Sequence, residues 1–563
     1  MKTLILTVIN KFKKINTMKI DFFSIFLNVF CLVALIFFVG HTYTPLIDIG
    51  REFYYPQRML SGSVFIKDLS SLFFPMSYFI NTILFLIFNK TIYGFYFAGI
   101  ISSLLFINIL YKISNKFCTK LLSFAVSFSA LVISITTYKI MNMHLPYSWA
   151  FVYGIIAFLY SVYYLISYLE TDKSKYFYIC AFFAGLACAF KYELILPGLF
   201  LLFFAIKRKK YNSVFLIVSP LFLSYLILLI QGVRLDDFIH QIEFVKSMFA
   251  STHANIFYKF CGIKFSFRSL YFSISSFIKV LFLGFLYFKA FKIKNSFLKY
   301  FSFLFLICLF CFVYLNKGYT ILIFSFCSLF LIFMYVLKFK LLSNSLKIVL
   351  FLFITFLLKN IWCVFLGGYG NYFAPFAILS IAILFSEIYD KNFQNKLAIL
   401  IIFLSLFVAQ YNLKDFSNIK YPIFSSKGKI YTDKITADNT NILNDFILKN
   451  TGQSDTIVIL PIGHTINFLT GRNTLDYFNY FSPEYLDCFS EDAVIEQFKK
   501  INPPYIVITN QDSSSHGAGY ICKDYGIRLC DFIFKNYYQI PLEQTINDSD
   551  EGLYYKIYKI NDN

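Results

Sequence analysis

Long apolar runs separated by short basic segments dominate the chain up to about residue 410. An α-helix needs about 20 apolar residues to cross the hydrocarbon core of a bilayer, and a set of such runs indicates a polytopic membrane protein. The pattern predicts about thirteen membrane-spanning helices. Their expected ranges are 22–40, 92–112, 119–138, 147–169, 176–190, 194–206, 212–231, 270–288, 299–316, 319–337, 347–366, 374–388 and 397–410.

The basic segments set the expected orientation. The run 22–40 follows a basic segment and precedes no small-residue cleavage pattern, so we expect an uncleaved signal anchor. Short loops rich in Lys and Arg stay in the cytoplasm. These loops contain Lys112, Lys116 and Lys120; Lys207, Arg208, Lys209 and Lys210; Lys289, Lys292 and Lys294; and Lys338, Lys340 and Lys347. Residues 1–20 are therefore expected in the cytoplasm, and an odd number of spans puts the C-terminus on the outer face.

Two segments depart from this simple alternation. In the loop 41–91, the polar stretch is followed by a short apolar one, which predicts one or two helices along the outer membrane surface over 49–89. The segment 176–206 is too long for one perpendicular span and short for two, and it carries Lys191-Tyr192-Glu193 at its centre. We expect a broken helical hairpin there, because irregular backbone at membrane depth requires a protein or aqueous cavity around it.

After the membrane region 21–411, residues 415–563 have ordinary polarity. Residues 456–460, 505–509 and 553–560 read as strands, and 441–448 and 491–501 have helical spacing. The alternation predicts a small water-soluble α/β domain on the outer face. Its cysteines allow a Cys522–Cys530 disulfide, which spacing alone does not establish.

Composition agrees with the membrane assignment. Hydrophobic residues make up 58% of the 563 residues and charged residues 15%, against about 25% charged residues in ordinary globular chains. The net charge of +20 is concentrated in the short loops. The positive-inside rule explains that placement, so we expect no nucleic-acid partner.

Candidate chemistry follows the first span directly. Asp48, Arg51 and Glu52 are spaced i, i+3 and i+4, so in a helix they would share one face. A carboxylate beside a guanidinium suits the deprotonation of a nucleophile and the binding of a phosphate. The alternative is a surface helix whose charges face water.

This segment resembles the first outer loop of the GT-C superfamily of membrane glycosyltransferases, which includes the protein O-mannosyltransferases and the lipid A aminoarabinose transferase. In that superfamily an Asp soon after the first span is the essential catalytic carboxylate, so the resemblance implies this role for Asp48. The commonest form is Asp-Glu. This chain places its glutamate four positions on, as Glu52, which is the second candidate catalytic residue.

The resemblance extends over about residues 20–410. It includes the surface helices after the loop, Gly185-Leu186-Ala187 followed by Lys191, and the outer segment Gly368-Tyr369-Gly370-Asn371-Tyr372 that leads to Pro375. The span count and the outer C-terminal domain are also similar to that superfamily.

Lysines within apolar runs are functional candidates on physical grounds. Lys191, together with Arg51, would neutralise the phosphate of a lipid-linked donor. The alternative is a structural ion pair with Glu193 that closes a broken helix. Lys359 is a second candidate, unless it only snorkels to the interface. Arg58, Glu193 and Tyr372 are further candidate substrate contacts.

The outer loop 232–269 places Asp236, His240 and Glu243 on one helical face. A divalent metal such as Mg²⁺ or Mn²⁺, or a substrate contact by His240, is one interpretation. An amphipathic helix with a solvated polar face explains the same spacing. In the C-terminal domain, His464 and Arg472 follow the first strand, where ligand sites of α/β folds tend to lie.

The sequence thus predicts an integral-membrane glycosyltransferase, placed in the inner membrane of a bacterium with its C-terminal domain in the periplasm. It would move a sugar from a polyprenyl-phosphate donor to a lipid, glycan or protein acceptor on the outer face. One alternative is a transporter or flippase, since broken helices and midplane charges also occur in carriers. Another is a polysaccharide polymerase or ligase that uses pyrophosphate donors.

Overall fold

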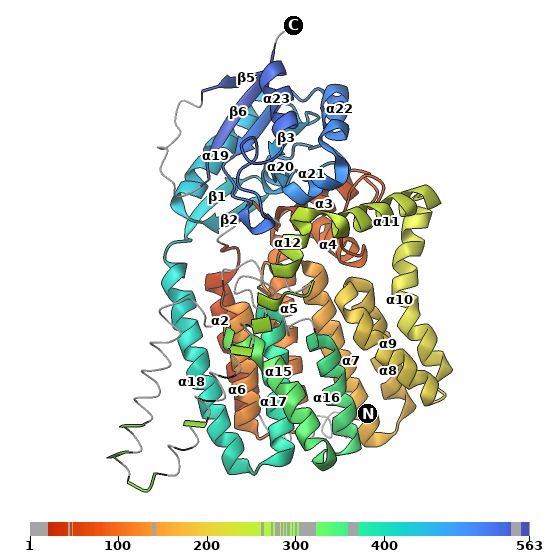
Figure 1. Cartoon of the computed structure of the whole chain (residues 1–563), viewed down its shortest axis with the longest axis vertical. Coiled ribbons are helices and arrows are strands. Elements are labelled where there is room, and N and C mark those ends of the chain that lie inside the picture. The colour runs from red at the N-terminus through yellow and green to blue at the C-terminus, as the bar shows by residue number, and fades with distance from the viewer. Residues whose placement is uncertain are drawn as a thin grey trace, which may run out of the picture.

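The computed structural model describes residues 21–42, 45–47, 49–137, 142–260, scattered residues between 264 and 302, 322–358, 370–541 and 553–561. A bundle of long helices forms the larger part, and a smaller mixed α/β part lies at one end of it (Figure 1). The bundle helices are α2 (Phe22–Phe38), α5 (Tyr93–Ser114), α6 (Lys120–Ala130) with the π-helix η1 (Leu131–Ile135), α7 (Trp149–Thr171), α8 (Ser174–Phe190), α9 (Ile195–Lys207), α10 (Tyr211–Ile230), α15 (Leu322–Lys338), α16 (Asn344–Leu357), α17 (Gly370–Ile388) and α18 (Lys391–Phe416).

The helices agree with the predicted spans wherever the structure describes the chain. By length and composition, α5, α7, α10 and residues 391–410 of α18 suffice to cross a membrane, and shorter apolar helices accompany them. Most of the predicted spans 270–288 and 299–316 lies outside the described residues. The count of thirteen spans therefore stays a prediction.

Burial distinguishes the inside of the bundle from its outer surface. Trp149 and Phe151 of α7 are fully buried, whereas Phe215 and Phe222 of α10 are exposed. Apolar side chains on the outside of a helical bundle are what a lipid environment requires. Helices α8 and α10 also approach closely, because a Cβ atom on Gly185 would lie 2.4 Å from the carbonyl oxygen of Ile217. The glycine of the Gly-Leu-Ala segment is thus a packing residue.

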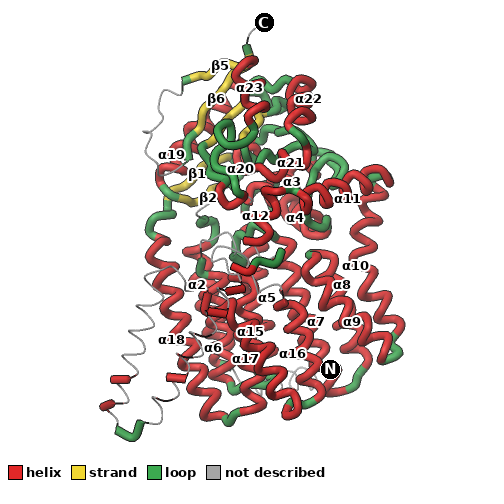
Figure 2. The backbone as a smooth tube through the Cα atoms, viewed as in Figure 1, coloured by secondary structure: helices red, strands yellow, loops and turns green. Residues whose placement is uncertain are grey.

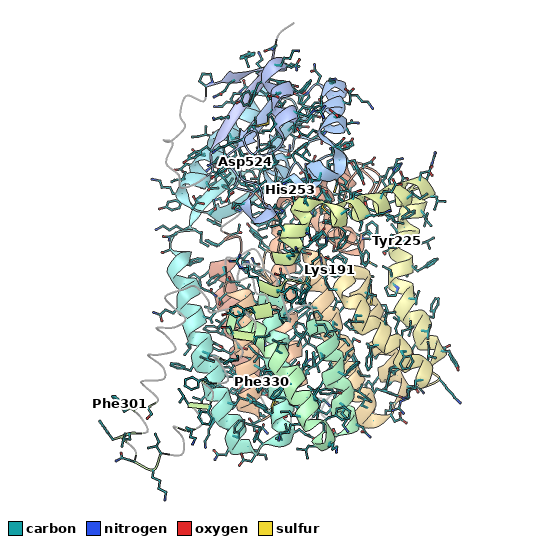
Figure 3. The ribbon with its side chains drawn as sticks, in the orientation of Figure 1. Lys191, Tyr225, His253, Phe301, Phe330 and Asp524 are labelled. Carbon is teal, nitrogen blue, oxygen red and sulfur yellow. A yellow bond between two sulfur atoms is a disulfide. The ribbon has the colours of Figure 1, made fainter. Side chains whose placement is uncertain are left out.

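The predicted break in 176–206 is confirmed. Helix α8 ends at Phe190, Lys191 has extended backbone, and the 3₁₀ turn η2 (Tyr192–Leu194) leads into α9. The two helices are antiparallel neighbours (Figure 1). Lys191 lies at the end of the bundle that faces the α/β part (Figure 3).

Four helices lie between the bundle and the α/β part: α3 (Ile49–Leu60), α4 (Met76–Ile87), α11 (Leu235–Ala250) and α12 (Thr252–Phe260). The predicted helices within 49–89 are confirmed as α3 and α4. Helix α12 contacts the α/β part through His253, whose Nδ1 lies 3.0 Å from Oδ2 of Asp487 (Figure 3). Arg51 and Glu52 on α3 are buried rather than solvated, because they pack against Phe73, Tyr78 and Trp149.

The C-terminal residues form the predicted α/β arrangement (Figure 2). Strands β3 (Ile457–Leu460), β4 (Tyr505–Thr509), β6 (Tyr555–Ile560) and β5 (Tyr537–Ile540) make one sheet in the order β3-β4-β6-β5. Only β3 and β4 pair in parallel within this sheet. The accompanying elements are the β1 (Tyr421–Ser425) and β2 (Gly428–Thr432) hairpin, the helices α19 (Lys434–Asn450), α20 (His464–Thr470), α21 (Pro483–Phe489), α22 (Glu491–Ile501) and α23 (Ile527–Asn536), and the turn η6 (Ser514–His516).

Alternating strand residues pack on opposite faces of this sheet, as the period of a strand requires. Val458 and Leu460 belong to the core on the side of α21, α22 and α23, whereas Ile457 and Ile459 pack with α19. Burial on both faces explains why β3 reads as a continuous apolar run.

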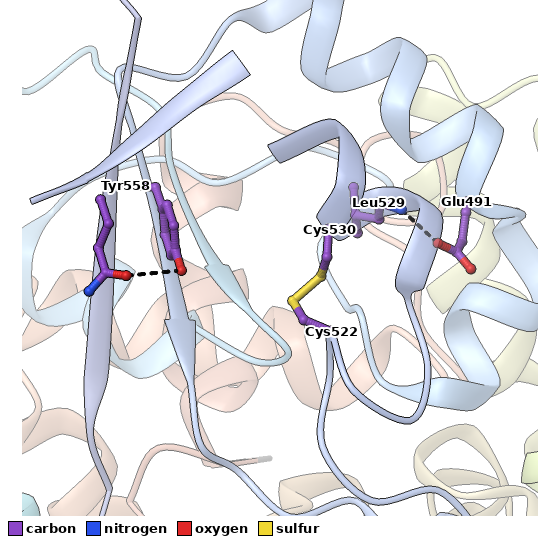
Figure 4. Close-up of a disulfide and its surroundings, with 6 residues drawn as sticks. Glu491, Cys522, Leu529, Cys530 and Tyr558 are labelled. Atoms are coloured by element: carbon purple, nitrogen blue, oxygen red, sulfur yellow. Dashed lines mark hydrogen bonds between the residues drawn. A yellow bond between two sulfur atoms is a disulfide. The ribbon is translucent and has the colours of Figure 1, made fainter. Parts of the chain in front are cut away.

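The Cys522–Cys530 disulfide is confirmed, with a Cα–Cα distance of 5.4 Å. It joins the loop before α23 to that helix (Figure 4). The backbone amide of Leu529, the residue before Cys530, donates a hydrogen bond of 2.7 Å to the side chain of Glu491 at the start of α22. The disulfide therefore fixes a corner that packs two helices together.

The β1–β2 hairpin fastens the α/β part to the bundle. The amide of Thr42 donates to the carbonyl of Tyr431 at 3.0 Å, and the amide of Tyr431 donates to the carbonyl of Gly40 at 2.8 Å. At the hairpin tip, Lys427 donates to the side chain of Gln57 and to the carbonyl of Phe468. The hairpin thus contacts the end of α2, helix α3 and helix α20 together.

Candidate active site

Two cations from distant parts of the chain converge on one aromatic ring. The guanidinium carbon of Arg51, on α3, lies 4.4 Å from the centre of the Phe73 ring. The ammonium nitrogen of Lys191, at the break after α8, lies 3.8 Å from the same centre. Arg51 is 5% exposed and Lys191 is 0% exposed. The structure therefore brings together two of the three residues that the sequence assigned to phosphate binding, and the third, Lys359, lies outside the described residues.

Glu52 holds Arg51 in place. Its Oε1 accepts hydrogen bonds from Nη2 of Arg51 at 3.1 Å and from the hydroxyl of Tyr78 at 3.2 Å. Its Oε2 accepts from the backbone amide of Trp149 at 3.3 Å. That amide is at the first turn of α7, where the backbone N–H groups lack helical partners and favour a carboxylate.

Burial changes the acidity of Glu52. Removal from water raises the pKa of this carboxyl above its ordinary value, and the charge and hydrogen bonds of Arg51 oppose the rise. A second bond of Arg51, from Nη2 to the carbonyl of Tyr147 at 3.3 Å, fixes the guanidinium further. The pair is thus anchored to the segment that enters α7.

Lys191 has a carboxylate of its own. Its ammonium lies 3.7 Å from Oε2 of Glu193 and 4.6 Å from the centre of the Tyr192 ring. The extended backbone of Lys191 ends the helix and makes this i+2 contact with Glu193 possible. The structural ion pair considered from the sequence therefore exists, and it lies beside Arg51 at the Phe73 ring.

Asp48 precedes α3 directly and lies outside the described residues. Its neighbours on both sides are fixed by α20. The hydroxyl of Thr465 donates to the carbonyl of Pro45 at 2.5 Å, and a Cβ on Gly50 would lie 2.3 Å from the amide nitrogen of Thr465. Arg51 and Glu52 lie on α3, which begins at Ile49, and the helical face that they are expected to share with Asp48 stays a prediction.

Arg58 and Tyr372, two of the candidate substrate-binding residues, form hydrogen bonds within the protein. Arg58 pairs with Asp476 at 2.5 Å and donates to the hydroxyl of Tyr54 at 3.2 Å, so it joins α3 to the α/β part. The hydroxyl of Tyr372 donates to the carbonyl of Asn142 at 3.0 Å. Lys359 lies outside the described residues.

The proposed metal ligands do not gather. His240 and Glu243 lie 3.6 Å apart on the exposed face of α11. Within the described part of the chain, no group of three or more His, Cys, Asp or Glu side chains is arranged to hold a metal ion. Asp236, His240 and Glu243 therefore do not form such a group in this structure, and the solvated amphipathic helix accounts for their spacing.

His464 is buried at the start of α20, against α3. Its ring lies 5.4 Å from Tyr54 and 4.4 Å from Tyr480 between ring centres, and its Nε2 is 3.3 Å from Oδ1 of Asn479. Burial, with a smaller contribution from the Arg51 charge, lowers its pKa to about 3. The histidine is therefore a neutral member of the contact between α20 and α3. The guanidinium of Arg472 donates hydrogen bonds to the hydroxyl of Thr451 and to the carbonyl of Thr470, and it thereby connects the ends of α19 and α20.

Sequence reasoning missed Phe73, Tyr78 and the amide of Trp149. Phe73 is one of 75 phenylalanines, so its type carried no signal. The partners of Arg51 and Glu52 come from α4, from the first turn of α7 and from the segments that precede these helices. Proximity to an outer loop after the first span was the only available hint.

The family of dolichyl-phosphate-mannose-protein mannosyltransferases matches residues 74–232. The matched range includes Lys191 and Glu193, and it begins after Arg51 and Glu52. No curated protein sequence matches the chain.

Solved structures of two membrane transferases show a remote similarity. Oligosaccharyltransferase AglB from Archaeoglobus fulgidus, in complex with an inhibitory peptide and a dolichol-phosphate, has a TM-score of 0.47 at 10% identity, over 86% of this chain and 69% of that one. ArnT from Cupriavidus metallidurans, bound to undecaprenyl phosphate, has a TM-score of 0.45 at 12% identity, over 95% of this chain and 97% of that one. TM-scores below 0.5 do not establish a common fold.

The family match over residues 74–232 and the apolar helices support a membrane glycosyltransferase of the GT-C type. The resemblance inferred from the sequence is thereby confirmed at the level of the superfamily.

Proposed function

We propose that the protein transfers a sugar from a polyprenyl-phosphate donor to an acceptor of the cell envelope, at the end of the bundle where Arg51 and Lys191 meet. The observation that carries the proposal is their convergence on Phe73, at 4.4 and 3.8 Å. The matched family is named for a dolichyl-phosphate sugar, which is a donor of this kind.

The two cations suit a lipid phosphate. A guanidinium offers a planar fork of hydrogen-bond donors, and an ammonium offers a compact charge. The attraction of both groups for a phosphate is stronger in a site that excludes water. Arg51 and Lys191 are nearly or fully buried, so their charges are weakly screened. Glu52 and Glu193 neutralise them before the donor binds, which lowers the cost of keeping two cations together.

The proposed reaction is a single displacement with inversion at the sugar. The acceptor oxygen or nitrogen forms a bond to the anomeric carbon as the bond from that carbon to the phosphate oxygen breaks. The bonding electron pair leaves with the phosphate, where Arg51 and Lys191 stabilise the developing charge. Asp48 receives the proton of the acceptor.

Glu52 has a different role in this proposal. Its carboxylate accepts three kinds of hydrogen bond, from Arg51, Tyr78 and Trp149. A carboxylate so occupied orients Arg51 better than it accepts a proton from a substrate. We therefore assign the base to Asp48 alone and treat Glu52 as a positioning residue.

The proposed location is the inner membrane of a bacterium, with residues 1–20 in the cytoplasm and the α/β part in the periplasm. The Cys522–Cys530 disulfide supports an oxidising compartment for that part. The α/β part covers α3 and contacts the site segment through Thr465, which suits a role in shaping the acceptor side. Lipid, glycan and protein acceptors all remain within the proposal.

The test compares membranes that contain wild type, Lys191→Met or Lys116→Met at matched abundance. Lys116 is a matched control, because it forms an exposed ion pair with Glu170 at 2.7 Å far from the site. Labelled polyprenyl-phosphate sugars are supplied, and label is followed into lipid, glycan and protein fractions. We expect Lys191→Met to lower transfer by about 10²–10³-fold and Lys116→Met to leave it unchanged.

Equal transfer by wild type and Lys191→Met would overturn the phosphate role of Lys191. Pyrophosphate-linked donors, supplied in parallel, test the polymerase or ligase alternative. Transfer from those donors alone would replace the monophosphate donor in the proposal.

A further inference from the structure

Helix α11 has an exposed apolar row along one side. Leu235, Ile239, Ile242 and Phe249 recur at the spacing of one helical face, and they are 74%, 44%, 67% and 43% exposed. Four large apolar side chains in one row, without cover from the described residues, form a surface that needs a partner.

The neighbouring row of α11 is polar and also exposed. It contains Asp236, His240, Glu243 and Ser247. His240 and Glu243 form a contact of 3.6 Å at more than 60% exposure. Because this row lies about a third of a turn from the apolar one, the helix presents an apolar side and a water-facing side next to each other.

The third side of α11 fixes the rotation of the helix. Phe244 is buried, and its ring lies 5.4 Å from that of Phe489 and 5.7 Å from that of Tyr485, both on α21. The side-chain amide of Gln241 donates to the carbonyl of Ser71 at 2.6 Å. These contacts hold the exposed rows in one orientation relative to the bundle.

The apolar row continues the lipid-facing surface of α10. At the end of α10, Leu229 and Ile230 are 52% and 78% exposed. A turn at Gly232, which has φ +89°, then redirects the chain, and α11 runs across the end of α10 (Figure 1). Since α10 is long and apolar enough to span the membrane, α11 extends along the plane in which the membrane surface would lie.

We propose that α11 binds the membrane surface, with Leu235, Ile239, Ile242 and Phe249 inserted at the boundary between headgroups and acyl chains. The occupant of this surface is lipid rather than a protein partner. Lys246 stands in the same row, and Arg234 directly precedes the helix. Their stems lie along apolar surface while their charges reach lipid phosphates. Asp236 and Glu243 are on the water-facing row.

This surface would give α11 a mechanical role. Its buried side contacts α21 of the α/β part and the segment at Ser71, two residues before Phe73. Attachment of α11 to the bilayer therefore sets the height of the α/β part above the lipid in which a lipid-linked substrate moves.

The test uses the full chain with single cysteines introduced as Ile242→Cys or Ser247→Cys and labelled with an environment-sensitive fluorophore. Ser247 is the matched control, since it is exposed on the polar row. The protein is placed in vesicles of phosphatidylcholine and phosphatidylglycerol, and labelling of the parent chain is subtracted. Nitroxide on the lipid chains and iodide in the water serve as quenchers.

We expect the label at position 242 to be quenched by lipid nitroxide at least threefold more strongly than the label at 247, and the order to be reversed for iodide. Iodide access at 242 equal to that at 247, or equal quenching of both by lipid nitroxide, would overturn the proposal. If Ile242→Cys does not yield folded protein by gel filtration, Ile239→Cys provides the same comparison.

Discussion

The hydroxyl of Thr465 donates a hydrogen bond of 2.5 Å to the carbonyl of Pro45, which lies 420 residues earlier in the chain. Both residues are buried at the junction of α20 and the segment that leads into α3. On the other side of position 48, Gly50 packs so closely on α20 that a Cβ would meet the amide of Thr465. The α/β part therefore fixes both flanks of the proposed catalytic aspartate.

Replacement of Thr465 by valine should impair transfer. The substitution keeps the shape of the side chain and leaves the buried carbonyl of Pro45 without its donor, which costs about 1–3 kcal/mol. We expect a several-fold loss of transfer with normal abundance. Thr470→Val is the matched control on the same helix, because the hydroxyl of Thr470 donates only to Ile466 within α20. Wild-type transfer by Thr465→Val would show that the hydrogen bond from Thr465 to Pro45 does not matter to the reaction.

Replacement of Glu52 by glutamine tests its assigned positioning role. The change leaves the buried guanidinium of Arg51 without its carboxylate, 3.1 Å away, and breaking a buried ion pair costs about 3–5 kcal/mol. We expect a lower unfolding temperature in detergent together with reduced transfer. The double variant Glu52→Gln and Arg51→Met removes both charges, so it should recover stability without recovering transfer. Recovery of transfer in the double variant would contradict the phosphate role of Arg51.

The contact between α20 and α3 should weaken in acid. The pKa of His464 is lowered from 6.5 to about 3 in the fold, so above pH 6.5 the histidine is neutral whether the contact is formed or not. Between pH 6.5 and 3 the open state binds a proton that the closed state does not, and opening is increasingly favoured as the pH falls. Hydrogen exchange of α3 and α20 should therefore be faster at pH 5 than at pH 7. His464→Phe should reduce this difference, and an unchanged pH dependence in that variant would assign it to other groups.

Removal of the disulfide should affect the α/β part alone. Cys522 and Cys530 close a short loop, for which the chain-entropy relation gives about 2–3 kcal/mol. Exchange of both cysteines for serine should loosen the loop and α23, as measured by limited proteolysis. Among the described residues, the core around this corner is separate from that of the bundle, so the bundle should resist protease as before. An unaltered cleavage pattern around α23 would show that the loop is held by packing.

The sequence predicted those features that depend on local pattern. Apolar run length gave the helices of the bundle, and a charged pair inside an apolar run gave the break at Lys191. The pairing of Lys191 with Glu193 was also visible as an alternative. The strands β3 and β4 were evident from their apolar runs.

The assembly of the site was beyond local pattern. The ion pair between the adjacent residues Arg51 and Glu52 was not predicted, because it depends on Tyr78 and Trp149, which hold the carboxylate where the long guanidinium reaches it. The role of Phe73 arises only when α3 and the α8–α9 break meet. Likewise, the burial of α3 depends on α20, which no spacing rule connects to the first outer loop.

The measurement that tests the account most directly is transfer of labelled sugar from polyprenyl phosphate by wild type and Asp48→Asn. Both are compared in membranes at matched abundance, with label followed into lipid, glycan and protein fractions. The account predicts transfer by wild type into one fraction and its loss, by at least about 10²-fold, in Asp48→Asn. A fully active Asp48→Asn enzyme would contradict the account.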